Sequence, residues 1–332
     1  LAARCGALVA TSAVAKGLFR DDPYDLDISG GFSSPLAAEL ISQADLIIGW
    51  GCALNMWTMR HGALIAPDAT VIQVDDTADA TGRYRSLTFG VVADVGATVH
   101  ALRDRVTAGA RYRTESVRER IATRIRWRDE PYDDLSGDGR IDPRSVSIAI
   151  DDMLPTERIV AVDSGNFMGY PSMFLSVPDE NGFCFTQAFQ SVGLGLAAAI
   201  GAALAQPHRL PVAALGDGGF LMASSELETV VRLGLPLLVV VYNDAAYGAE
   251  VHHFGPDGYP LGTVTFPDPD IAQIAAGFGF AAVTARTLED LRPVAEWLAQ
   301  YLRGDPVPPM LIDAKVITHQ ASWWLEEAFR GH

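Results

Sequence analysis

Two short apolar runs separated by a helical segment constrain the fold of this chain most strongly. Residues 211–215 and 237–243 are mostly apolar, and residues 224–234 between them are typical of a helix that ends at a glycine. An apolar run of this length predicts a strand that is buried on both faces. A strand, a crossover helix and a second strand form a right-handed parallel unit. The segment therefore predicts a parallel sheet in which both strands end at the same edge.

The same alternation of strands and helices continues along the chain. Ser34 and Asp142 each precede a proline and predict helix starts, and Thr287 stands in capping-box spacing with Asp290. Helices are predicted over residues 34–44 and 95–106, among others. Further strands are predicted at residues 7–11, 45–51, 70–76, 158–163, 183–187, 280–285 and 309–316.

A charged stretch divides the chain into two parts. Residues 111–142 are dense in charge and poor in apolar positions, which is typical of a solvent-facing helix and a linker. We therefore predict an α/β protein with two doubly wound parallel-sheet domains. The first covers residues 1–108, a charged linker or helix covers 109–140, and the second covers 141–332.

Composition excludes several classes of function. The formal net charge is −16, which argues against a nucleic-acid surface, and no apolar run is long enough to span a bilayer. We therefore expect a cytoplasmic protein that binds neither nucleic acid nor membrane. Cys5, Cys52 and Cys184 have no metal-binding spacing and are expected to be reduced thiols. Neither lysine, Lys16 nor Lys315, stands in a phosphate-loop motif.

Two acidic residues follow the two apolar strands of the central unit. Asp217 lies in a glycine turn after the first strand, and Asp244 comes directly after the second. We expect the two carboxylates to converge at the carboxyl edge of the sheet, with Asp217 on a turn outside the core. Mg²⁺ takes oxygen ligands and commonly binds carboxylates together with phosphate oxygens. The pattern predicts a metal-bridged diphosphate site, in which Gly216, Gly218 and Gly219 let backbone N–H groups approach the phosphates.

Other interpretations of this segment remain open. Asp217 alone is also typical of a helix cap, and Asp244 alone of an Asx turn. An NAD-linked dehydrogenase is a further alternative. The dinucleotide fingerprint is incomplete, however, because Gly216 and Gly218 fit it while Leu221 takes the place of its third glycine.

Several segments resemble the thiamine diphosphate-dependent enzymes, in particular acetolactate synthase and its relatives. The sequence "GDG" at residues 216–218, followed after a crossover helix by "ND" at 243–244, resembles the cofactor motif of that family. "QSVGLGLAAAIGAALA" resembles the helix that precedes the motif. "GALVATSAVAKGLF" and "SQADLIIGWGCAL" resemble the family's Rossmann-like central domain, so the resemblance covers nearly the whole chain.

The resemblance implies a set of cofactor-binding residues. Asp217 and Asp244 would bind Mg²⁺ by their side chains, and Ala246 would bind it by its carbonyl oxygen. Thiamine diphosphate would be contacted by these two aspartates and by further residues, which are Gly165, Asn166, Gln190, Val192, Gly216, Gly218, Gly219 and Tyr247.

The chain departs from the family pattern at several positions. Asp244 replaces the second asparagine of the usual pair, and Val192 replaces a larger residue that bends the cofactor. Glu250 and His253 make the expected substrate pocket more polar, and both are candidate catalytic residues. Arg60 does not stand where FAD-binding relatives carry their arginine, so FAD is not expected.

The resemblance implies an enzyme that decarboxylates a 2-oxo acid and then releases or ligates the product. The family's pyrimidine-binding domain, which supplies an activating glutamate, has no counterpart in this sequence. The chain by itself is therefore expected to be inactive, and a homodimer, a homotetramer or a pyrimidine-binding partner domain is expected to complete the site. The alternative is a non-catalytic or regulatory subunit of a split thiamine diphosphate enzyme.

Overall fold

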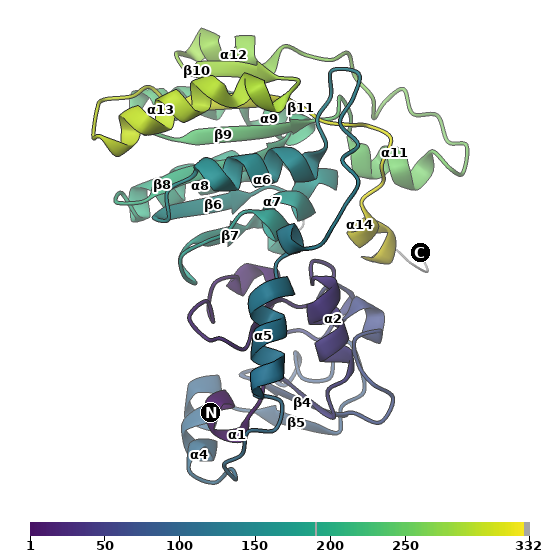
Figure 1. The fold of residues 1–332 in the computed structure, drawn as a ribbon. Coiled ribbons are helices and arrows are strands. Elements are labelled where there is room, and N and C mark those ends of the chain that lie inside the picture. The colour runs from purple at the N-terminus through teal and green to yellow at the C-terminus, as the bar shows by residue number, and fades with distance from the viewer. Residues whose placement is uncertain (190, 329–332) are drawn as a thin grey trace. The chain divides into compact units, whose positions relative to one another are not determined.

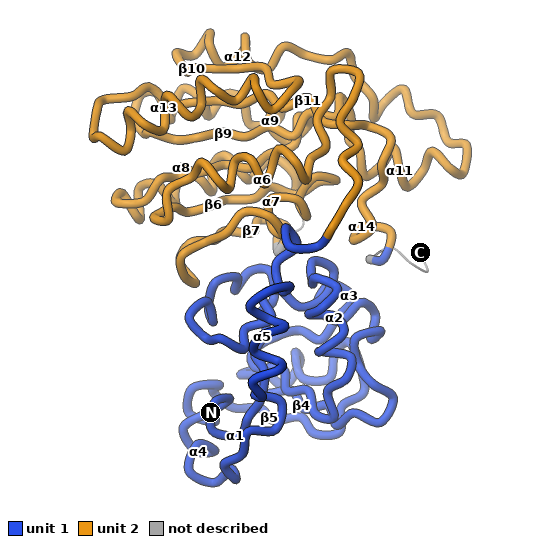
Figure 2. Tube along the Cα trace, in the orientation of Figure 1, with its two compact units in different colours: residues 1–130, 327–332 blue, residues 131–326 orange. Residues whose placement is uncertain are grey.

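The structure is a computed structural model that describes residues 1–189 and 191–328. The chain divides into two compact units (Figure 2). Unit 1 comprises residues 1–130 together with the C-terminal residues from 327, and unit 2 comprises residues 131–326. Each unit is described by itself.

Unit 2 is built on a parallel sheet. In its described residues, six strands pair in the order β10-β11-β9-β8-β6-β7, and every pairing is parallel (Figure 1). β8 and β9 carry the two apolar runs and are buried along nearly their whole length. The strands are β6 (Arg158–Val162), β7 (Phe183–Phe185), β8 (Leu210–Gly216), β9 (Leu238–Asn243), β10 (Ala281–Ala285) and β11 (Met310–Lys315).

Helices cover both faces of this sheet. Alternate residues of β9 point to opposite faces, so Val239 and Val241 join a core cluster with Leu196 and Phe220, while Tyr242 hydrogen-bonds Ser147 on the other face. The predicted doubly wound architecture of this unit is confirmed. Its helices are α6 (Pro143–Met153), α7 (Gly169–Phe174), α8 (Gly195–Ala205), α9 (Asp217–Ala223), α10 (Leu227–Arg232), α11 (Gly248–Phe254), α12 (Ile271–Phe278), α13 (Arg292–Leu302) and α14 (Trp323–Ala328).

Unit 1 carries two smaller parallel sheets in its described residues. One pairs β1 with β2, and the other has the order β3-β4-β5. The core cluster of this unit takes four buried residues from α2, and the others come from β2, β4, α3, α5 and two loops. The elements are α1 (Ala2–Cys5), β1 (Val9–Thr11), β2 (Asp25–Ile28), α2 (Pro35–Ser42), β3 (Leu46–Trp50), α3 (Met56–Met59), β4 (Thr70–Asp75), β5 (Phe89–Val92), α4 (Val95–Arg103) and α5 (Glu115–Arg124).

The predicted helix caps are present. The Ser34 hydroxyl accepts a hydrogen bond from the Ala37 N–H at 3.2 Å, and the Asp142 carboxylate accepts one from the Arg144 N–H at 2.8 Å. The capping box at Thr287 is also formed, and it opens a 3₁₀ turn that leads into α13. Local polar groups therefore set these helix starts as the sequence predicts.

One element differs from the prediction. Residues 216–219 were expected to form a turn before a helix at residue 224, but α9 begins at Asp217 itself. Gly216 has extended backbone angles and is the cap residue, so the chain passes from β8 into the helix without an intervening loop. The acidic Asp217 in the first turn suits the positive end of the helix. A second helix, α10, follows after a short 3₁₀ turn.

The polar contact between α6 and β9 offers a test of the packing of unit 2. The Tyr242 hydroxyl lies 2.8 Å from the Ser147 hydroxyl, and both residues are fully buried. Replacing Tyr242 with phenylalanine should lower the free energy of unfolding by about 1 kcal/mol, because one buried hydrogen bond is lost. Urea unfolding measures this change. Tyr259, which is 60% exposed, is the control: its replacement by phenylalanine should leave the unfolding curve unchanged.

Candidate functional site

The candidate site lies at the carboxyl edge of the unit 2 sheet, where three neighbouring strands end. Asp163 follows β6, Asp217 follows β8, and Asp244 follows β9. Because the strands are parallel and adjacent, these three acidic residues lie at one edge. The sequence analysis identified Asp217 and Asp244 but not Asp163.

Asp217 and Asp244 repel each other in a buried setting. Asp217 is 1% exposed, and its carboxylate accepts hydrogen bonds from the N–H groups of Gly218 at 2.8 Å and Ala246 at 3.2 Å. The pKa of Asp217 is raised to about 8, first by burial and then by the charge of Asp244. Burial also raises the pKa of Asp244, to about 6. Asp217 is therefore buried at the start of a helix, which corrects the expectation that it lies on a turn outside the core.

The turn after β9 brings the second carboxylate towards the first. The Asn243 side chain accepts a hydrogen bond from the Ala245 N–H at 3.1 Å. Ala245 has φ of 59°, in the left-handed region that residues with a side chain adopt infrequently. The next residue, Ala246, donates its N–H to Asp217. A strained backbone therefore places Asp244 and Ala246 beside Asp217.

Asn166 approaches the same carboxylates from the loop after β6. Its side chain hydrogen-bonds Asp244 and lowers the pKa of that carboxyl group. A Cβ atom at Gly248 would lie 2.2 Å from Asp244 Oδ2 and 3.0 Å from Asn166 Nδ2, so both groups crowd against that glycine. Asn166 Oδ1 is buried and has no hydrogen-bond partner among the described residues. A buried acceptor without a partner indicates that a ligand or ion is expected here.

The glycines of the motif are explained by packing of the chain's own side chains. A Cβ at Gly218 would lie 2.4 Å from the Tyr247 ring, and one at Gly219 would lie 2.5 Å from Asp163 Oδ2 and 3.4 Å from Val192. A Cβ atom added at Gly165 or at Gly216 would contact the ring of Phe167. These glycines allow close internal contacts, and the Gly218 N–H already donates to Asp217. Whether the N–H groups of Gly216, Gly218 and Gly219 also approach phosphates stays a prediction.

Asp163 organises the start of α8. It is fully buried, and its carboxylate accepts hydrogen bonds from the N–H groups of Gly193 at 2.9 Å and Leu194 at 3.2 Å. Burial raises its pKa, although these backbone N–H groups oppose the shift. The segment that carries Val192 is thereby fixed beside Gly219. The sequence signal for Asp163 was the same as for Asp244, an acidic residue directly after an apolar strand.

The remaining candidate residues are not among the hydrogen-bond partners given above for Asp163, Asp217 and Asp244. Gln190 lies outside the described residues. Glu250 and His253 are both exposed on α11, with the His253 ring edge-on to Phe254 at 4.7 Å. Their catalytic roles remain predictions. In unit 1, Arg60 donates hydrogen bonds to Gly30 and Ser33, each at 3.0 Å, so part of its guanidinium holds a loop of its own unit.

The residues at the edge fit a divalent cation. Neither Asp217 nor Asp244 makes an ion pair with a basic side chain among the described residues, and the charge of Arg140 only partly offsets the raised pKa of Asp244. No cluster of three or more His, Cys, Asp or Glu side chains in the described chain is placed to hold a metal. Mg²⁺ needs only one or two carboxylates when phosphate oxygens complete its shell. The two carboxylates and the buried Asn166 Oδ1 would suit a Mg²⁺–diphosphate group.

The fold and the site define an α/β protein with an acidic ligand site at the strand ends of a doubly wound sheet. Residues 163–313 match the model described as "Thiamine pyrophosphate enzyme, C-terminal TPP binding domain". Residues 1–102 match that described as "Thiamine pyrophosphate enzyme, central domain". The chain therefore belongs to the thiamine pyrophosphate-dependent enzyme family.

Curated relatives extend this assignment. A sulfoacetaldehyde acetyltransferase of Rhodobacter capsulatus is 31% identical over 282 residues, which are 78% of this chain and 48% of that protein. The acetolactate synthase large subunit of Parasynechococcus marenigrum is 27% identical over 317 residues, 94% of this chain and 50% of that protein. The chain thus spans about half the length of the curated relatives it matches. In the described residues, every helix is too short or too polar to cross a membrane.

The buried carboxylate pair predicts a pH-dependent stability in the absence of metal. Asp217 keeps its proton in the folded protein up to about pH 8 but loses it near pH 4 when unfolded. Unfolding therefore releases a proton in this window, and the free energy of unfolding should fall as pH rises, by about 1.4 kcal/mol per pH unit for one such group. Urea unfolding in metal-free buffer at pH 5 and pH 8 measures the fall. Asp217→Asn should flatten it, and parallel pH profiles for the two proteins would contradict the prediction.

The contact between Gly218 and Tyr247 predicts a steric effect. In Gly218→Ala the new methyl group must displace the Tyr247 ring, which should destabilise the protein by about 1–3 kcal/mol. Gly201 is the matched control, because it is also helical but a Cβ there meets nothing within 4 Å. Gly201→Ala should stabilise the protein by about 0.5–1 kcal/mol. Equal shifts of the same sign in the two thermal unfolding curves would argue against the contact.

Proposed function

We propose that this chain forms the central and cofactor-binding parts of a thiamine diphosphate- and Mg²⁺-dependent enzyme that acts on a 2-oxo acid. The observation that carries the proposal is the pair formed by the buried Asp217 and the partly buried Asp244, whose carboxyl groups have raised pKa values and form no ion pair with a basic side chain among the described residues. A divalent cation between the two carboxylates would attract both of them and so offset their repulsion. The family assignment supports thiamine diphosphate as the ligand that brings the cation.

The residues of the site divide into two proposed roles. Asp217, Asp244 and the Ala246 carbonyl would hold Mg²⁺. Asn166, through its unpartnered acceptor Oδ1, would face the Mg²⁺ or a water bound to it. Val192 lies against Gly219 and would support the cofactor from the α8 side. When bound, thiamine diphosphate supplies the carbon nucleophile that these residues do not contain.

The proposed reaction class is decarboxylation of a 2-oxo acid followed by transfer of the remaining acyl unit or its release. The relatives support this class, because they are named as an acetyltransferase and as acetolactate synthases. We further propose that a pyrimidine-binding domain supplies the glutamate that activates the cofactor. Glu250 does not serve this role in the proposal because it is exposed on α11.

Calorimetric titration tests the cofactor assignment. Thiamine diphosphate should bind in the presence of Mg²⁺ and much more weakly after chelation, while NADH should not bind. Asp217→Asn should reduce the affinity at least tenfold, because one metal ligand loses its charge. Asp257→Asn removes one exposed carboxylate on the same unit and should leave the affinity unchanged. NADH binding, or equal affinity in the Asp217 variant, would refute the proposal.

An activity assay tests the reaction class. The protein supplied with a pyrimidine-binding domain should release CO₂ from pyruvate in a reaction that depends on both thiamine diphosphate and Mg²⁺. Cofactor binding without any turnover would instead support a non-catalytic subunit. In the active protein, His253→Ala should change the preference among 2-oxo acids, because its imidazole lies on the helix that follows the Asp244 turn. An unchanged preference would leave His253 a surface residue.

A further inference from the structure

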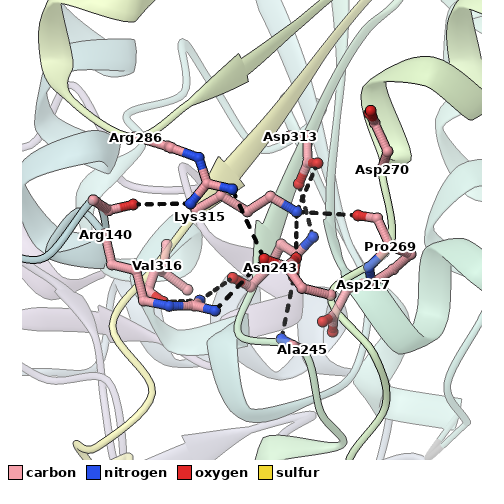
Figure 3. Close-up of polar contacts among 12 residues, drawn as sticks. Arg140, Asp217, Asn243, Ala245, Pro269, Asp270, Arg286, Asp313, Lys315 and Val316 are labelled. Carbon is pink, nitrogen blue, oxygen red and sulfur yellow. Dashed lines mark hydrogen bonds and ion pairs between the residues drawn. The ribbon is translucent and has the colours of Figure 1, made fainter.

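A buried lysine lies behind the carboxylate pair. Lys315, one of two lysines in the chain, ends β11 and is 2% exposed. Its ammonium group lies 3.0 Å from Asp313 Oδ2 and 2.5 Å from Asp268 Oδ1, and it donates a hydrogen bond to the Pro269 carbonyl at 3.1 Å. Figure 3 shows the Lys315 side chain extended between these groups. None of these contacts belongs to the proposed cofactor site.

The Asp313 carboxylate connects this lysine to the neighbouring strand. Asp313 is fully buried, and its Oδ1 accepts a hydrogen bond from Asn243 Nδ2 at 2.8 Å (Figure 3). In the sheet register Lys315 is paired with Asn243, so Asp313 lies diagonally across from it. The amide of Asn243 is therefore oriented by a charged acceptor, which binds it more strongly than a neutral one would.

Asn243 then fixes the turn that carries the second carboxylate. With its Nδ2 held by Asp313, its Oδ1 faces the Ala245 N–H and accepts it at 3.1 Å. This contact spans Asp244 and accompanies the left-handed conformation of Ala245. The Asn243 carbonyl is held in turn by Arg140 at 3.3 Å. Contacts of the side chain and of the carbonyl of Asn243 thus hold the turn.

We propose that Lys315 is a positioning residue for the metal site. By neutralising Asp313, it holds the Asn243 amide in the orientation that keeps the turn at residues 243–246 folded. That turn presents Asp244 and Ala246 to Asp217. The proposal rests on the proposed function, because the group to be bound is Mg²⁺ with thiamine diphosphate. Substituting residues that orient metal ligands without binding the metal commonly lowers metal affinity 10–100-fold.

The physical reason is the cost of an uncompensated buried charge. Without Lys315, Asp313 would be an ionised carboxylate with no adjacent cation, and it would take up a proton or draw in water. Either change weakens its hold on Asn243. The Ala245 N–H would then lose its oriented acceptor, and the left-handed turn would relax, because alanine has no intrinsic preference for it. Asp244 and Ala246 would then move away from Asp217, although neither residue has been substituted.

The test compares Lys315→Met with Arg158→Met. Arg158 forms an ion pair with Asp151 at 3.0 Å at the amino end of β6, so its replacement removes a similarly buried pair far from the carboxyl edge. Lys315→Met should weaken the binding of Mg²⁺ with thiamine diphosphate about 10–100-fold in calorimetry, whereas Arg158→Met should lower stability and leave the affinity unchanged. Equal affinities of wild type and Lys315→Met would overturn the inference.

Amide exchange of the cofactor-free protein separates this inference from the proposed function. The Ala245 amide should exchange faster in Lys315→Met than in wild type, while core amides such as that of Val240 keep their protection relative to global stability. If wild type fails to bind thiamine diphosphate, the proposed function is refuted, but the exchange data still decide the role of Lys315. Unchanged protection of the Ala245 amide overturns that role.

A double variant checks the route through Asp313. Lys315→Met combined with Asp313→Asn leaves no uncompensated charge at position 313 and keeps an oxygen there that accepts from Asn243, while Asp268 keeps Arg140 and Arg286 at 3.8 and 3.9 Å. The double variant should therefore protect the Ala245 amide and bind the cofactor better than Lys315→Met alone. If the single variant does not fold, the double variant is measured in its place. Faster exchange of the Ala245 amide in the double variant than in Arg158→Met would overturn this route.

Discussion

The repulsion between two buried carboxylates is the constraint around which the carboxyl edge of unit 2 is arranged. Burial raises the pKa of Asp217 and of Asp244, the charge of Asp244 raises that of Asp217 further, and the sheet holds both residues at one edge. A protein that used this edge for packing alone would gain from apolar residues there. Backbone N–H groups of Gly218 and Ala246 instead stabilise the charged form of Asp217. The edge is therefore built to hold charge, which is why a cation is the simplest partner for it.

The sequence predicted those parts of the fold that depend on local pattern. The strands of unit 2 carry continuous apolar runs, and their burial follows directly from composition. The position of Asp217 and Asp244 at one edge followed from the parallel topology alone. Where the pattern was weak the prediction failed: β2 alternates aspartate with apolar residues, and β5 is largely exposed, so neither strand was predicted. Pairing with neighbouring strands, not composition, forms these two elements.

Contacts between distant segments could not be predicted from sequence. Gly218 is small because the Tyr247 ring lies against it, and Gly219 because Asp163 does. Both partners come from other strand ends, so the reason for each glycine exists only in the folded protein. The same holds for Asn166, whose position beside Asp244 depends on how β6 and β9 are placed across the sheet. Residue spacing indicated which chemistry was possible, and packing determined which atoms meet.

The polar groups around the turn after β9 fall into two sets that differ in how their charge is compensated. One set is Asp217 and Asp244, whose carboxyl groups form no ion pair with a basic side chain among the described residues and whose pKa values are raised. In the second set, Asp313 is neutralised by Lys315. Asn243 donates to Asp313 through one end of its amide and accepts the Ala245 N–H at the other, so it joins the second set to the turn that carries Asp244. The ion pair between Lys315 and Asp313 can therefore hold the turn in place without pairing with Asp217 or Asp244, which leaves these two carboxylates available for the proposed cation.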